Sequence, residues 1–257
     1  MKFLQSLSAQ VSLFTQGAIL ALGVVFILLD VITESLNPVI DLAWVTVLVC
    51  GLPLLINSVQ SIWERLEIHA NFLIVVAMVA LISNGDYHTA AYVGLIVQAG
   101  FFLEQLITGE SHYTVDDDML PTMPAQLVAM RQGINNYSSV IVVAVLLLSM
   151  GSFALTQDFI HTVTLLLVLC PCSLELILVA LMMGSLVDDA SPVSALSKGT
   201  KQSHLGLLIV SIVFHVAIIC VGVLGLMDPV TAVALHGLAR LGLVYNLKVL
   251  NGSLCVA

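Results

Sequence analysis

The chain has 257 residues, of which 60% are hydrophobic and only 9% charged, and its formal net charge is −9. This composition excludes an ordinary water-soluble domain and indicates a polytopic membrane protein that is surrounded by the lipid bilayer. The negative charge argues against nucleic acid as a partner, and the few basic residues form no polybasic patch for anionic lipids.

Hydropathy and turn residues divide the chain into eight predicted membrane-spanning helices. The first is too long for the apolar part of a cleavable signal peptide, so we interpret it as an uncleaved helix. Turn signals such as Asn84-Gly85-Asp86 and Asp228-Pro229 separate neighbouring spans. The sequence therefore predicts an all-α bundle that forms a single transmembrane domain over residues 1–257. Its spans are residues 11–32, 39–60, 70–83, 89–107, 138–154, 162–184, 204–226 and 230–250.

The basic residues predict how this bundle is oriented. If the N-terminus lies inside, six of the seven Lys and Arg residues fall on the cytoplasmic side, and the connections assigned to the outside contain none. We therefore expect both termini in the cytoplasm, and we predict the inner (cytoplasmic) membrane of a prokaryote as the location. The longer cytoplasmic connections are residues 108–137 and 187–202. Neither can house a nucleotide-binding domain, which needs on the order of 100 residues.

The sixth span contains Cys170-Pro171-Cys172 near its middle. A proline inside a helix removes one backbone donor and frees the carbonyl four residues earlier, here that of Leu167. In lipid, such a break persists only where other groups or a cavity satisfy the freed polar atoms. On a regular helix the two thiols would point to nearly opposite sides. Unwinding at a kink at Pro171 lets both sulfurs turn toward one point, as a soft ion such as Cu(I) or Zn(II) requires.

Further ionisable residues inside the predicted spans indicate a function, because their burial in lipid is costly. Glu175 lies three residues after Cys172, and Arg240 lies one turn from His236, so each pair shares a helix face. A lone guanidinium at mid-bilayer costs from ~3 to more than 10 kcal/mol, so Arg240 needs a partner. We take Glu175 as the only central carboxylate in the spans and predict a Glu175–Arg240 ion pair. His215 lies in the middle of the seventh span.

Several stretches, taken in chain order, resemble one known family. Gly51-Leu52-Pro53 is similar to a kinked platform helix, Phe102-Leu103-Glu104 to the end of a fourth helix, and Cys170-Pro171-Cys172 to an ion-binding signature. His236 falls where the final helix of some subclasses carries a metal ligand. These features resemble the membrane domain of heavy-metal-transporting P-type ATPases over nearly the whole chain. The resemblance implies that family's helix bundle and a heavy-metal site.

The soluble domains of that family have no counterpart in the internal connections. The resemblance implies an actuator domain where this chain has residues 108–137, and phosphorylation and nucleotide domains where it has residues 187–202. The phosphorylated Asp-Lys-Thr-Gly-Thr motif and the Gly-Asp-Gly hinge motif are absent, so this chain alone cannot transfer a phosphoryl group. Thr108-Gly109-Glu110-Ser111 spells the dephosphorylation motif of the actuator, but a match of four common residues is expected by coincidence.

Two interpretations of the intramembrane polar residues stay open. In the first, Cys170, Cys172, His215 and His236 form a metal site with two sulfur and two nitrogen ligands, which suits Zn(II), or Cu(I) with fewer ligands. In the second, the kinked helix only maintains the fold, the thiols are protonated packing groups, and the predicted ion pair fills the former ion site.

The sequence thus predicts a protein that is not an enzyme and binds no nucleotide. The leading interpretation is a pseudo-P-type ATPase that acts as an accessory or scaffold subunit, with other membrane protein subunits as partners. The alternative is a membrane protein that binds Cu(I) or Zn(II) and buffers, delivers or passively conducts it for a partner. A third interpretation is the membrane half of a split metal pump whose ATPase domains come from another chain.

Overall fold

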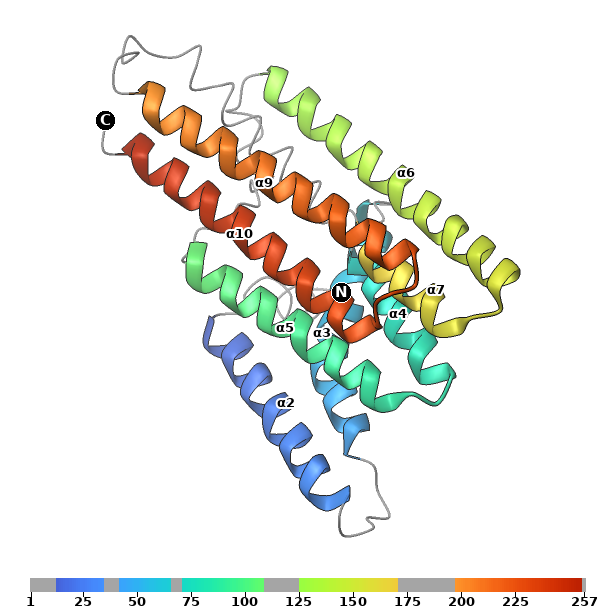
Figure 1. The fold of residues 1–257 in the computed structure, drawn as a ribbon. Helices are drawn as coiled ribbons and strands as arrows, with labels where there is room; N and C mark the ends of the chain where they lie inside the picture. Colours follow the sequence, from blue (N-terminus) through green and yellow to red (C-terminus); the bar gives the residue numbers. More distant parts are fainter. Residues whose placement is uncertain (1–12, 35–41, 66–70, 109–124, 171–196, 256–257) are drawn as a thin grey trace.

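The computed structural model describes residues 13–34, 42–65, 71–108, 125–170 and 197–255, and the regular structure in these ranges is entirely helical. The helices form a bundle (Figure 1). The predicted all-α class is therefore confirmed for the described part of the chain. Its eight helices are α2 (Leu13–Glu34), α3 (Ala43–Arg65), α4 (Asn71–Ser83), α5 (Tyr87–Thr108), α6 (Ala125–Thr156), α7 (Phe159–Val168), α9 (Ser197–Val223) and α10 (Pro229–Cys255).

Each predicted span overlaps one of these helices, but the helices differ in apolar length. Among the described residues, four helices contain windows long and apolar enough to cross a bilayer, and four contain shorter apolar stretches. Membrane association is therefore supported, whereas the full set of eight spans and the P-type ATPase bundle stay predictions. The long windows are Phe14–Ile32, Ala43–Gln60, Tyr87–Ile107 and Tyr137–Thr156, and the shorter stretches are Asn71–Ser83, Phe159–Val168, Ile209–Val223 and Pro229–Tyr245.

Two helices begin earlier than the predicted spans. α6 starts at Ala125 and α9 at Ser197, so the ends of the predicted connections 108–137 and 187–202 are helical. The first turns of α6 are rich in Ala, Gln, Leu and Met, which favour helix in water as well as in lipid. Hydropathy reports on transfer into lipid and so misses a helix that continues into the aqueous phase. The connection between α5 and α6 is therefore shorter than predicted, and the second predicted connection ends earlier, at the start of α9.

α7 ends just before the Cys170-Pro171-Cys172 sequence. Its last residue is Val168, and Leu169 is its C-cap, with an N–H that donates to a carbonyl one turn earlier at 3.0 Å. Proline disfavours the helical conformation in the residue that precedes it, which accounts for a helix end at this point. The predicted kink residue, Pro171, and the remainder of the sixth predicted span lie outside the described residues.

The connection between α4 and α5 is a tight turn, as the sequence Asn84-Gly85-Asp86 predicts. Gly85 has a φ of +82°, a left-handed conformation that glycine adopts without strain. The Asp86 carboxylate accepts the N–H of Thr89 at 3.1 Å and so caps the first turn of α5. The local sequence therefore ends one helix and starts the next.

The connection between α9 and α10 likewise contains a glycine in the left-handed conformation and an aspartate that caps the following helix. Gly225 has a φ of +70°, and the Asp228 carboxylate accepts hydrogen bonds from the N–H of Thr231, at 3.3 Å, and from its hydroxyl. The side-chain hydrogen bond from Thr231 lowers the pKa of Asp228 below its ordinary value. Both turns lie on the side of the bundle that is predicted to face away from the cytoplasm.

Helices pack closely where glycine leaves room for a neighbour. A Cβ atom at Gly23 on α2 would lie 2.8 Å from the Cys50 sulfur on α3 and 2.9 Å from a methyl group of Leu95 on α5. A Cβ atom at Gly222 on α9 would lie 3.0 Å from the side chain of Val168 on α7. Small residues at such positions let helices approach and gain van der Waals contact, which stabilises bundles in lipid.

α10 contacts helices on two of its sides. It packs most extensively against α5, and it also packs against α9 and α7 (Figure 1). α7 and α9 also contact one another. α9 and α10, which carry His215 and His236, therefore meet α7, which ends two residues before Cys170, and α5 lies against the other side of α10.

The packing at Gly23 predicts a stability difference between two glycine substitutions. Gly23→Ala places a Cβ atom within 3 Å of two neighbours, so it should lower the free energy of unfolding by about 1–3 kcal/mol. Gly151→Ala is the control, because a Cβ atom there meets nothing within 4 Å and alanine favours helix by about 1 kcal/mol. Thermal unfolding in detergent measures both. Equal stability of the two variants would contradict the packing of α2 described above.

A buried histidine pair and an interhelical ion pair

Two predicted metal ligands come together at the contact between α9 and α10. His215 on α9 and His236 on α10 are 8% and 7% exposed, respectively, and are therefore buried. Their ring centroids are 5.6 Å apart, and the rings are inclined at 85°. The sequence placed these residues in different spans, and the packing of α9 against α10 makes them neighbours.

One hydrogen bond indicates which ring nitrogen of His215 carries a proton. Its Nδ1 atom lies 2.8 Å from the carbonyl oxygen of Ser211, one turn earlier on α9. A carbonyl can only accept, so Nδ1 carries the proton and donates it. In the neutral imidazole, Nε2 then holds the lone pair that can bind a metal ion. A hydrogen bond of this kind also orients the ring of a metal-binding histidine.

The separation of the two rings fits ligands of one metal ion. Because a Zn–N bond is about 2.0–2.1 Å long, two imidazoles on one tetrahedral ion have centroids roughly 5 Å apart. The observed distance of 5.6 Å is close to this value. The donor set is also suitable, since imidazole nitrogen binds both Zn(II) and copper. The pair therefore supplies up to two of the four ligands that the sequence predicts.

The remaining predicted ligands are not gathered around this pair by the described residues. Cys170 is buried directly after the end of α7. Within the described ranges, however, no group of three or more His, Cys, Asp or Glu residues is placed to hold a metal ion, so Cys170 does not complete the site there. Cys172 lies outside the described residues, as does Glu175.

Arg240 has a partner that the sequence argument overlooked. Its Nη2 atom lies 3.0 Å from one carboxylate oxygen of Glu104 on α5 and 3.3 Å from the other. Its guanidinium also lies over the ring of Phe101, 5.3 Å from the centroid, which adds a cation–π contact. Arg240 therefore has a carboxylate partner that a search limited to central carboxylates left out. The Glu175–Arg240 pair itself stays a prediction, because Glu175 is not described.

The signal for Glu104 was present in the sequence. Glu104 lies inside the fourth predicted span, and it belongs to the apolar window Tyr87–Ile107 of α5. We expected it only to mark the end of that helix, on the basis of the family resemblance. An ionisable residue within a span should have been weighed as a partner for any other intramembrane charge.

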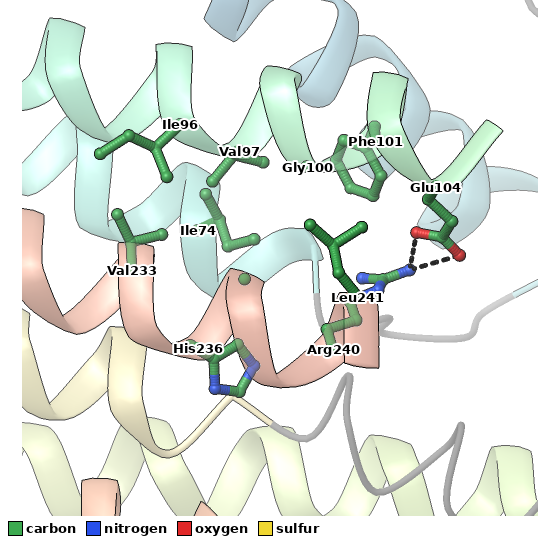
Figure 2. A pocket seen from close by; sticks show the side chains of 11 residues that line it. Ile74, Ile96, Val97, Gly100, Phe101, Glu104, Val233, His236, Arg240 and Leu241 are labelled. Atoms are coloured by element: carbon green, nitrogen blue, oxygen red, sulfur yellow. Dashed lines mark hydrogen bonds and ion pairs between the residues drawn. The ribbon is translucent and has the colours of Figure 1, made fainter. Parts of the chain in front are cut away.

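The ion pair and the histidine pair use different sides of α10. Figure 2 shows Arg240 extending toward Glu104 on α5, whereas the ring of His236 lies on the side of α10 near the end of α7. Although the two residues are one turn apart, their side chains diverge. The charge of Arg240 is thus balanced by Glu104 and directed away from the histidines.

The pairing of Arg240 with Glu104 predicts non-additive effects on stability. Glu104→Gln and Arg240→Met each leave one charge without its partner, so each should lower the free energy of unfolding by roughly 1–3 kcal/mol. The double variant should lose less than the sum of the two. Thermal unfolding of the four proteins measures the coupling. Strictly additive losses would contradict an interaction between these side chains.

Comparisons with protein-family models, with curated proteins and with solved structures gave no match for this chain. The resemblance to heavy-metal P-type ATPases therefore remains an interpretation of the sequence, and the geometry of the described residues is the basis for a functional proposal.

Proposed function

We propose that this protein binds Zn(II) or Cu(I) inside its helix bundle and buffers, delivers or passively conducts the metal for a partner. The observation that carries the proposal is the pair of buried histidines, His215 and His236, on adjacent helices. Two imidazoles at this separation, one with Nε2 as its lone-pair nitrogen, suit a soft or borderline ion. Cys172, and Cys170 after a local rearrangement, are the candidate sulfur ligands.

The charge balance around α10 supports this proposal over a filled, inactive site. A guanidinium without a counter-charge would repel a cation in a low-dielectric interior. Here the Arg240 side chain is 3.0 Å from the Glu104 carboxylate and points away from His236. Because Glu104 supplies a counter-charge, Arg240 does not require Glu175 for charge balance.

The sequence provides no means of coupling metal binding to ATP. Both internal connections that would carry the ATPase domains are short, and the phosphorylation motif is absent. The proposed protein is therefore not an enzyme, and it binds no nucleotide. Metal would be held, handed to a partner or moved down its own gradient.

Metal analysis of the purified protein tests the proposal. After loading with Zn(II), or with Cu(I) under reducing conditions, we expect about one metal ion per chain, because four ligands complete a tetrahedral site. His236→Ala and Cys172→Ser should each lower this ratio severalfold, since lost ligands weaken binding.

Cys220→Ser and His88→Ala are the matched controls, because Cys220 is exposed and His88 is about half exposed. Both should bind like the wild type. A wild-type protein that binds no metal, or a His236→Ala variant that binds it unchanged, would overturn the proposal.

A second candidate function is the accessory or scaffold subunit. The observation in its favour is the exposure of α2 and α6: only 11% and 17% of the residues in their apolar windows are buried within the described protein. Lipid or other subunits must cover these surfaces. The split-pump interpretation has no described residue in its favour and stays a prediction.

Crosslinking in native membranes tests the scaffold function. A photoreactive residue at Leu147 on α6, which is 65% exposed, should give one discrete adduct with another membrane protein. The same residue at Val142, which is fully buried on α6, should give none. Lipid adducts alone at Leu147 would contradict a stable partner on this helix.

A further inference from the structure

A half-open pocket of about 50 Å³ lies between α5 and α10, with Ile74 of α4 among its lining residues. Apart from its charged end and His236, it is lined mainly by aliphatic side chains and by Phe101 (Figure 2). A groove of this kind on a membrane protein offers an acyl chain more contact than it offers water, because its walls present few polar partners.

Two glycines, one in each wall, leave this space open. A Cβ atom added at Gly100 on α5 or at Gly237 on α10 would meet nothing within 4 Å. Gly94 on α5 differs, because a Cβ atom there would lie 2.9 Å from Met78. Glycine inside a helix costs about 1 kcal/mol relative to alanine. Close packing accounts for the glycine at position 94. At Gly100 and Gly237, the missing side chain instead leaves space that a bound molecule can fill.

Glu104 and Arg240 form the polar end of the pocket. Their side chains are 23% and 22% exposed, so a ligand in the pocket can contact both charged groups. Glu104 lies three residues before Ile107, the end of the apolar window of α5, which is about 5 Å along the helix. Arg240 reaches the same level, because its Nη2 atom lies 3.0 Å from the Glu104 carboxylate and its long side chain extends from α10 toward that group. The charges therefore lie within reach of the lipid headgroups.

We propose that this pocket binds a zwitterionic phospholipid whose headgroup carries a primary amine, as in phosphatidylethanolamine. A segment of an acyl chain lies along Gly100 and Gly237. The lipid phosphate contacts the guanidinium of Arg240, and the ammonium group donates hydrogen bonds to the carboxylate of Glu104. The site adjoins the histidine pair, because His236 also lines the pocket, but lipid binding there does not require a bound metal ion.

The charges explain why one headgroup class is favoured. An anionic lipid such as phosphatidylglycerol would bring its phosphate to Arg240 but would offer no cation to Glu104. Phosphatidylcholine carries a cation, but its quaternary ammonium has no N–H to donate. Only a headgroup with a phosphate and a protonated amine adds a charge-assisted hydrogen bond to each member of the pair, beside the contact that the two side chains already share.

Native mass spectrometry of the intact protein, released from nanodiscs, tests this site. The nanodiscs contain phosphatidylethanolamine, phosphatidylcholine and phosphatidylglycerol in equal amounts and with identical acyl chains. We expect the wild type to retain roughly fivefold to tenfold more phosphatidylethanolamine than either of the other lipids. Hydrogen bonds to charged groups are strong enough to give a preference of this size. In Glu104→Gln, the ratio of bound phosphatidylethanolamine to bound phosphatidylcholine should fall to about twofold or less.

Two leucine substitutions on α10 separate a specific site from general lipid contact. Gly237→Leu fills the pocket and should abolish the preference, whereas Gly242→Leu should keep it, because Gly242 is exposed and does not line the pocket. Thermal unfolding verifies that both variants are folded. Equal retention of the three lipids by the wild type, a preference for phosphatidylglycerol, or identical behaviour of the two leucine variants would each overturn the proposal.

Discussion

A charge inside a membrane must have a counter-charge, and in the described part of this protein Glu104 on α5 supplies one for Arg240 on α10. The two charged groups lie 3.0 Å apart and join helices that are far apart in the sequence. Leaving either charge without its partner would cost roughly 1–3 kcal/mol. The ion pair thus favours one placement of α10 against α5, and α10 in turn carries His236 to its position beside His215.

This arrangement separates two kinds of polar chemistry within one bundle. On the α5 side of α10, opposite charges neutralise one another beside an apolar pocket. On the side toward α7 and α9, two imidazole rings are buried together, and the hydrogen bond from His215 to Ser211 leaves Nε2 as the nitrogen that can bind an ion. The fixed cation therefore does not compete with a metal ion for the same space. The proposed metal binding is therefore electrostatically feasible beside this ion pair.

Local features of this fold could be predicted from the sequence, whereas contacts between helices could not. Hydropathy located all eight helical segments, glycine and aspartate predicted the turn at Asn84-Gly85-Asp86, and the proline effect accounts for the end of α7. These signals act within a few residues. The start of α6 at Ala125 was missed because a helix can continue beyond the lipid, where hydropathy gives no signal.

The same difference between local features and contacts between helices holds for the candidate site. His215 and His236 were identified because an ionisable residue within a span is unusual, and their proximity follows from the packing of two helices. Glu104 was overlooked as a partner because the family resemblance assigned it to the end of the fourth helix, so only central carboxylates were considered. No rule of sequence spacing pairs residues on α5 and α10, since that pairing depends on how the helices pack.

X-ray absorption spectroscopy of the Zn(II)-loaded protein tests the central claim, that the histidine pair binds a metal inside the bundle. The account predicts imidazole scattering from two nitrogen ligands at about 2.0 Å, together with sulfur at about 2.3 Å, and the loss of one imidazole in His215→Ala. A spectrum without imidazole, or one that His215→Ala leaves unchanged, would contradict it.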